Sequence, residues 1–106
     1  MSYRFMRIIV FFDLPTLTDK NRREYRSFRK MLIENGFVMM QESVYTRMVL
    51  NRTVQNSVVD LLIKNKPSDG LVQALVITEK QFSNIVNVLG SFQSDVVDTD
   101  ERMIIL

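Results

Sequence analysis

The sequence predicts an α+β fold in which two helices pack on one face of a four-stranded antiparallel sheet. Three observations lead to this prediction. Short apolar runs that are typical of strands alternate with stretches of helical spacing, and glycine or proline residues stand at the boundaries. The resulting order of elements is β-α-β-β-α-β, which is the order of a ferredoxin-like sandwich.

The first half of the chain is expected to form a strand, a helix and two further strands. The first strand covers about residues 3–12, since five apolar residues in a row are typical of a strand buried on both faces. A helix capped by Thr16 or Thr18 then runs to about Asn35, and Gly36 takes the left-handed position after it. Two strands follow, over residues 37–40 and 44–50.

The second half is expected to add a helix, a strand and a short helix. The first of these helices begins near Thr53, has apolar residues at helical spacing, and stops before Pro67. A turn over residues 67–70 leads into a strand over residues 71–78. Thr78 and Gln81 have the spacing of a capping box, which predicts a short helix that runs through Leu89.

Residues 91–106 are expected to form a separate C-terminal segment after a ferredoxin-like domain over residues 1–90. The segment is polar and acidic at first and ends on four apolar residues. Because the four-stranded sheet is complete by residue 78, the end is expected to be an extra strand that pairs with the sheet of a second subunit. The alternative is a strand that folds back on its own sheet. Apolar residues on the sheet face without helices also favour a homodimer.

Charge is unevenly distributed along the chain. Residues 1–53 contain 10 Lys and Arg against 5 Asp and Glu, whereas residues 54–106 contain 4 against 7. A basic surface on a small domain often binds nucleic acid, because Lys and Arg release counterions from phosphates. A charged face that meets only solvent is the alternative.

The basic side chains of the first predicted helix gather on one flank. At 100° per residue they fall within an arc roughly 120° wide, which only Ile33 interrupts. Nearby carboxylates are too few to neutralise them all by pairing along the helix. A two-fold dimer would present the flank twice, and no base-reading arrangement is visible, so we expect sequence-independent binding to the backbone of a duplex. The basic flank consists of Arg22, Arg23, Arg26, Arg29 and Lys30.

Composition excludes several kinds of active site. The chain has no His and no Cys, so it can build neither a Ser-His-Asp nor a Cys-His nucleophile, nor a zinc site with the usual ligands. The lack of cysteine fits a reducing cytoplasm, and no apolar run reaches membrane-spanning length. We therefore expect a soluble, cytoplasmic protein with no membrane partner.

Asp13 is the residue best placed to carry chemistry. It directly follows the first apolar run and precedes Leu14 and Pro15, so it is expected at the carboxyl end of a central strand. Carboxylate-bound Mg²⁺ that assists phosphodiester cleavage is the chemistry that the composition leaves open. A two-fold axis beside Asp13 would add Asp13 of the second subunit to this site. The alternative is a turn aspartate that hydrogen-bonds backbone amides nearby.

Three motifs give the chain a family resemblance. Residues 12–15 (FDLP), 36–45 (GFVMMQESVY) and 76–82 (VITEKQF) together resemble CRISPR-associated protein two, in the form that accompanies a single large effector nuclease in type II systems. The likeness runs from about Tyr3 to Leu106. It implies a homodimer of ferredoxin-like subunits that exchange their C-terminal strands.

The resemblance also implies a function. In that family the dimer bridges two dimers of the CRISPR-associated integrase and helps hold a short duplex, the prespacer, for insertion as a new spacer. The family is also described as a metal-dependent endonuclease on RNA or DNA, and Asp13 matches its Mg²⁺-binding aspartate by motif position. We expect Mg²⁺ or Mn²⁺ as the cofactor and an architectural role in which Asp13 is dispensable. The alternative is a stand-alone, toxin-like endoribonuclease that acts on single-stranded RNA with a pair of Asp13 carboxylates.

Overall fold

The order of helices and strands in the computed structural model, which describes residues 5–90, is the predicted one. The strands form one antiparallel sheet in the order β2-β3-β1-β4, which confirms the ferredoxin-like α+β sandwich. The predicted C-terminal strand, in residues 91–106, lies outside the described residues. The elements are β1 (Met6–Asp13), α1 (Asp19–Glu34), β2 (Val38–Gln41), β3 (Val44–Val49), α2 (Arg52–Lys64), β4 (Leu71–Thr78) and α3 (Glu79–Ser83).

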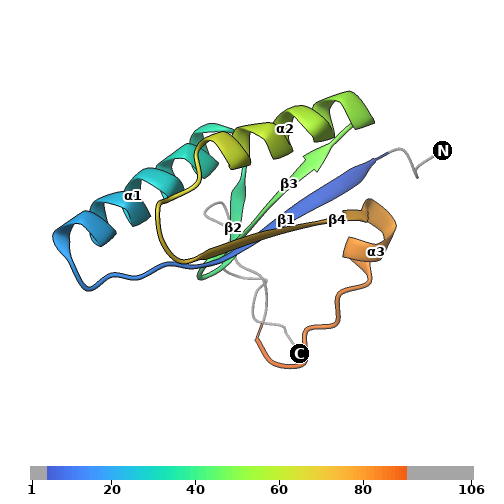
Figure 1. Cartoon of the computed structure of the whole chain (residues 1–106). Helices are drawn as coiled ribbons and strands as arrows, with labels where there is room; N and C mark the ends of the chain where they lie inside the picture. Colours follow the sequence, from blue (N-terminus) through green and yellow to red (C-terminus); the bar gives the residue numbers. More distant parts are fainter. Residues whose placement is uncertain (1–4, 91–106) are drawn as a thin grey trace.

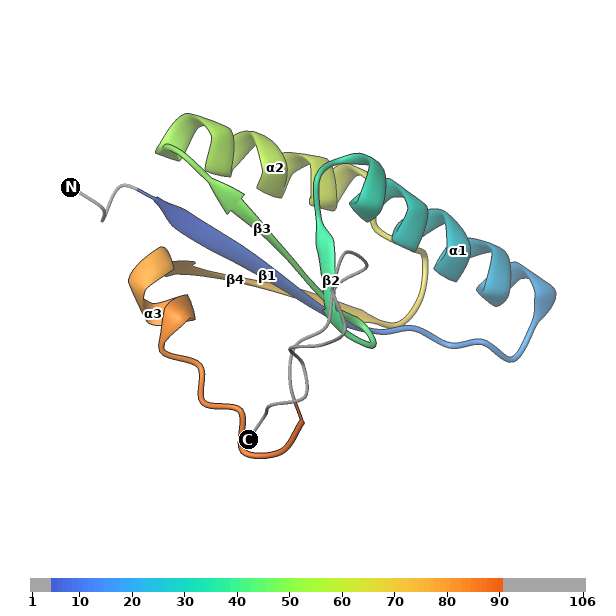
Figure 2. The same ribbon diagram turned by 180° about the vertical axis from the view of Figure 1, so that it is seen from behind.

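The helices lie on both sides of the sheet, in unequal amounts. α1 and α2 run across one face, while α3 and the segment after it lie on the opposite side (Figure 1). Figure 2 shows the same layers from behind. No helix in the described part of the chain is long and apolar enough to cross a membrane. We call the face away from α1 and α2 the open face.

The hydrophobic core fills the space between the sheet and the two long helices. Phe12 lies at its centre, with its ring edge-on to that of Phe28 at 5.2 Å between centroids and stacked on that of Tyr45 at 5.7 Å. Phe28 and Leu32 are buried, as their helical spacing predicted. The buried residues of the core are Ile8, Val10, Phe12, Phe28, Leu32, Phe37, Tyr45, Val49, Val58 and Leu62.

Local hydrogen bonds decide where α1 begins and ends. Thr18, rather than Thr16, is the N-cap, because its hydroxyl accepts a bond from the Asn21 N–H at 3.0 Å and the Asn21 side chain accepts one from the Thr18 N–H at 3.2 Å. Gly36 follows the helix with a φ of 88°, in the left-handed region that glycine adopts without strain.

Several boundaries in the first two-thirds of the chain differ from the prediction. β1 begins at Met6 rather than near residue 3, and it includes Asp13, which pairs with Leu71. β2 is shifted by one residue, and β3 ends one residue early. α2 begins at Arg52 because the Asn51 side chain caps it, accepting a hydrogen bond from the Val54 N–H at 2.8 Å.

The predicted length of α3 is wrong. The helix ends at Ser83 and does not run through Leu89. Asn84 is its C-cap, and the segment that follows is rich in Asn and β-branched Val and Ile, which are weak helix formers. Residues 84–90 are exposed, so no buried face offsets that weakness.

The open face is partly covered, contrary to the expectation that it has no helix of its own. The guanidinium of Arg7, on β1, donates from Nε to Glu79 Oε1 at 2.9 Å and lies over the ring of Phe82 at 4.2 Å from its centroid. These contacts fasten α3 to β1. Leu71 and Leu75 of β4 nevertheless remain 54% and 49% exposed on this face, so much of its apolar surface has no cover among residues 5–90.

Candidate functional site

Asp13 ends β1, one of the two inner strands of the sheet, and lies on the open face. Side chains alternate along a strand, and Phe12 points into the core, so Asp13 points the other way, as Phe11 does. Its side chain is exposed, and no hydrogen bond within residues 5–90 reaches its carboxylate. The alternative of a turn aspartate bonded to neighbouring amides is therefore not observed in this part of the chain.

The surface beside Asp13 is a shallow depression of about 190 Å³. Across residues 5–90, no group of three acidic side chains gathers anywhere, and Asp13 is the one acidic residue among those that line this depression. Mg²⁺ is commonly held by one or two carboxylates together with water and substrate phosphates. The donor set therefore fits Mg²⁺ once a phosphodiester or a second carboxylate is added. The depression is lined by Phe11, Phe12, Asp13, Ser43, Val44, Leu71 and Gln73.

Two tight turns flank the backbone of Asp13. On one side the Phe12 N–H donates to the Ser43 carbonyl at 3.0 Å, and Ser43 has a φ of 63°. On the other side is Gly70, with a φ of 98°, packed directly against the backbone of Asp13 and Leu14. The sequence indicated a turn at residues 67–70 but not this contact, because the contact is tertiary and no local pattern encodes it.

The structure ties two members of the basic flank to protein partners. The Arg22 guanidinium donates to two backbone carbonyls of the loop over residues 14–18, at 2.9 and 3.2 Å, and pairs with Asp19. Arg29 Nε donates to the Tyr45 hydroxyl at 2.8 Å, so this cation holds α1 to β3. Both guanidiniums thus contribute to the fold as well as to surface charge.

The other three members of the basic flank are more available to a ligand. Lys30 makes only a loose pair with Glu34, at 3.9 Å between Nζ and Oε2. Arg23 and Arg26 are exposed, and neither pairs with a carboxylate of residues 5–90. Of the five cations predicted to form one flank, two are therefore bonded to protein groups that hold the fold together, and three are accessible to a ligand.

Arg47 is a cation that sequence reasoning did not select. It lies on the helix side of β3, where its guanidinium donates to the Asn35 carbonyl at the end of α1 at 3.2 Å. This bond gives it a structural role beside Gly36. Its position in a strand gave no periodic signal that would group it with the cations of α1.

Glu24 joins α1 to the loop before β4. Its carboxylate accepts hydrogen bonds from the Ser68 hydroxyl at 2.8 and 2.9 Å and from the Ser68 N–H at 3.1 Å. These bonds hold the pKa of Glu24 below its ordinary value, and the bond from the Ser68 hydroxyl has the largest effect. The nearby charges of Lys20 and Arg23 lower the pKa further. The carboxylate therefore fixes the loop that carries Gly70.

Glu24→Gln is expected to destabilise the fold near neutral pH but not in acid. A lowered folded-state pKa contributes stability above the ordinary glutamate pKa of about 4.3, and this contribution is lost as the pH falls through the lowered value. Near neutral pH, the urea midpoint of Glu24→Gln should be lower than that of the wild type. In acid the midpoints of the two proteins should converge. Glu34→Gln is the control, and an identical pH dependence in both variants would contradict the role of Ser68.

Comparison with known proteins connects this geometry to a family. The family described as CRISPR associated protein Cas2 matches residues 6–85. A CRISPR-associated endoribonuclease Cas2 from Treponema denticola is 48% identical over 95% of this chain and 100% of its own. Proteins of the same description from Ligilactobacillus salivarius and Streptococcus mutans are 43% and 38% identical, each over 95% of this chain and over 100% and 93% of their own lengths. With these matches the resemblance read from the three motifs is confirmed, and the chain belongs to the Cas2 family.

Proposed function

We propose that this chain is a CRISPR spacer-acquisition subunit, which acts as a homodimer that binds the backbone of duplex DNA and bridges dimers of the integrase. The basic flank carries the DNA-binding part of the proposal. Arg23, Arg26 and Lys30 lie exposed along one helix, where they can follow a row of phosphates. Membership of the Cas2 family supports the role in spacer acquisition.

Apolar surface on the open face supports the dimer. Leu71 and Leu75 are about half exposed, and the segment after α3 contains Val88 and Leu89 at 92% and 94% exposure. Exposed apolar surface of this kind marks an interaction site, because leaving it in water costs free energy. A second copy that places its own open face here would bury both surfaces at once.

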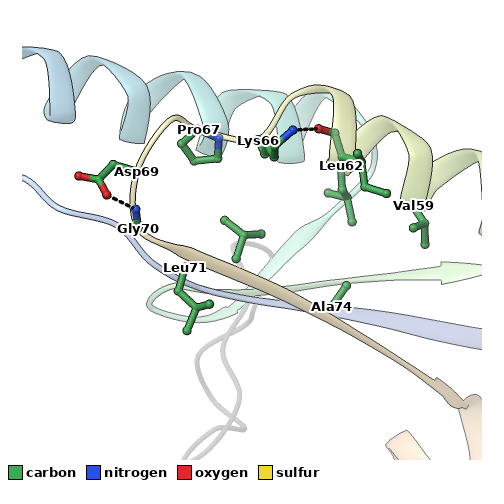
Figure 3. Close-up of a pocket in the computed structure, with 10 residues that line it drawn as sticks. Val59, Leu62, Lys66, Pro67, Asp69, Gly70, Leu71 and Ala74 are labelled. Atoms are coloured by element: carbon green, nitrogen blue, oxygen red, sulfur yellow. Dashed lines mark hydrogen bonds between the residues drawn. The ribbon is translucent and has the colours of Figure 1, made fainter.

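The outer edge of β4 supports the exchange of C-terminal strands. β4 ends the sheet in the order β2-β3-β1-β4, so its outer backbone groups have no strand partner within residues 5–90. Beside this edge is an apolar groove of about 390 Å³, in which Val59 and Leu62 of α2 face Ala74 of β4 (Figure 3). The apolar residues 103–106 of a second copy have the character of a strand that would cover such an edge.

Removing charge from the accessible part of the basic flank is expected to weaken duplex binding. In the triple variant Arg23→Gln, Arg26→Gln and Lys30→Gln, affinity for a duplex should fall by about tenfold or more, because each phosphate contact adds about 0.9 to the slope of log affinity against log salt. Fluorescence anisotropy at several salt concentrations measures both the affinity and the slope.

A matched control separates the flank from overall charge. Lys64→Gln, Lys66→Gln and Lys80→Gln remove the same charge from α2, from the residues after it and from α3. This variant should bind duplex DNA nearly as well as the wild type. If the two triple variants bind equally well, the basic flank is not the DNA-binding surface.

A second candidate function is metal-dependent cleavage of RNA. The matched relatives are named endoribonucleases, and Asp13 is an exposed carboxylate at the end of β1, an inner strand. A divalent cation held there supplies positive charge that stabilises a phosphodiester under attack by water. Asp13 of each subunit of the dimer would orient the cation, and the basic flank would hold the flanking phosphates. Mg²⁺ and Mn²⁺ are both compatible with carboxylate and phosphate oxygens.

Reconstituted spacer integration distinguishes the two functions. The reaction with the partner integrase is run with wild type, with Asp13→Ala and without this protein. Integration that requires the protein but not Asp13 supports the architectural role. Integration that proceeds equally without the protein would refute that role, and a loss in Asp13→Ala alone would assign integration to the carboxylate site.

A further inference from the structure

The approach of Gly70 to the end of β1 is the closest that any of the three glycines makes to its surroundings. A Cβ placed on Gly70 would lie 2.7 Å from the Asp13 carbonyl oxygen, 2.9 Å from Leu14 Cδ2 and 3.1 Å from Leu14 Cα. The nearest of these atoms belongs to the backbone, which cannot change its position as easily as the end of a flexible side chain can. A side chain at this position would therefore displace the chain at residues 13–14 or the turn itself.

We propose that Gly70 is a positioning residue for the Asp13 carboxylate, because it lets the turn before β4 pack against the last residue of β1. This inference rests on the proposed cleavage activity of Asp13 and names a residue that acts through it. Gly70 itself offers no side chain to substrate or cation. Its contribution is the space that it leaves beside the Asp13 carbonyl.

Both sides of this contact are held by hydrogen bonds. The Gly70 N–H donates to Asp69 Oδ1 at 2.8 Å, and Ser68 is bound through its N–H and its hydroxyl to Glu24 of α1. On the other side, Asp13 pairs with Leu71 of β4, and Arg22 donates to two backbone carbonyls of the loop that follows. Because neither side is free to move away, an added side chain at position 70 should distort the contact itself, including the backbone that carries the Asp13 carboxylate.

Gly36 provides a control for the cost of backbone conformation. Its φ of 88° is close to the 98° of Gly70, so alanine is strained at both positions. A Cβ on Gly36 would meet only the Arg47 side chain, at 3.5 Å or more, which is an ordinary contact. Gly36→Ala therefore carries the conformational strain of Gly70→Ala without the collision.

The first measurement uses the metal-free protein. The backbone amide resonances of Asp13 and Leu14 should shift in Gly70→Ala and stay in place in Gly36→Ala. Gly70→Asn should behave as Gly70→Ala does, because Asn tolerates a positive φ but still carries a Cβ. If Gly70→Asn restores the wild-type resonances, the conformation of residue 70 is what matters and the inference is wrong.

The second measurement is the Mg²⁺ dependence of RNA cleavage. In Gly70→Ala the maximal rate should fall by about 10- to 100-fold, as for a displaced reacting group, and half-maximal cleavage should require more Mg²⁺. Gly36→Ala should keep the wild-type Mg²⁺ requirement, since a loss of folded protein lowers the rate without changing that requirement. Equal Mg²⁺ requirements in the two variants would refute the positioning role.

The two measurements also separate this inference from the proposed activity. Should the wild type show no Mg²⁺-dependent cleavage, the proposed activity fails, and the amide resonances alone decide whether Gly70 positions Asp13. If Gly70→Ala does not fold, Ser68→Ala replaces it in the test. This variant removes the hydroxyl that bonds to Glu24, and so loosens the same turn without adding an atom. That variant should shift the Asp13 resonances in the metal-free protein, and unchanged resonances would overturn the inference.

Discussion

Asp13→Asn is expected to lower the rate of Mg²⁺-dependent RNA cleavage by about 100-fold or more, because the charge stabilisation that a bound cation supplies is worth several kcal/mol. The replacement keeps the size of the side chain and removes its charge. Asp13 is exposed and accepts no hydrogen bond within residues 5–90, so the fold should lose little. Cleavage of single-stranded RNA at saturating Mg²⁺, with unfolding midpoints measured in parallel, tests this expectation.

Asp60→Asn is the matched control for Asp13. Asp60 is an exposed aspartate on α2, away from the open face, so its replacement should leave cleavage unchanged. Duplex binding should survive in both variants, because the basic flank is intact in each. Cleavage that persists in Asp13→Asn, or that resists a chelator, would show that the activity does not depend on this carboxylate.

Phe12→Ala is expected to lower the free energy of unfolding by about 3–5 kcal/mol, the usual cost of removing a buried phenyl ring. The ring is 5% exposed and makes aromatic contacts with Tyr25, Phe28 and Tyr45, so its loss leaves a cavity between β1, α1 and β3. Small domains have a total stability of about 5–15 kcal/mol, so this single change removes a large part of it. Urea unfolding monitored by circular dichroism measures the loss.

Two further variants make the Phe12 prediction specific. Phe12→Leu refills most of the cavity and should cost much less than Phe12→Ala, which keeps the test informative if the alanine variant unfolds. Phe5→Ala removes the same ring from a 42% exposed position and should cost about 1 kcal/mol or less. Similar losses for Phe5→Ala and Phe12→Ala would contradict a core centred on Phe12.

The fold was predictable because its local signals agree with its tertiary contacts. The strand over residues 71–78 was predicted at its observed boundaries, and the helix expected after Thr18 is capped as the sequence suggested. The errors lie where a signal was weak. The capping box at Thr78 indicated that α3 begins there but carried no information on its length, which depends on whether a face is buried.

The candidate site was predictable only in part. The end of an apolar run placed Asp13 on the sheet, and helical periodicity placed the basic flank on α1. The bond from Arg29 to Tyr45 and the contact of Gly70 with Asp13 join segments far apart in the chain, so no pattern along the sequence reports them. The metal, the dimer and the integrase stay predictions.

The register of β1 has a consequence for the synthesis of the chain. Met6 of β1 pairs with Thr78 of β4, and Ile9 pairs with both Thr46 and Leu75. Of the two inner strands in residues 5–90, β1 is thus the first to leave the ribosome and the last to gain both neighbours. Until β4 has been made, the apolar residues of β1 have at most one strand beside them. Strand pairings between segments so far apart in the chain form slowly. Within residues 5–90, the sheet therefore gains its fourth strand only after some 78 residues have been synthesised.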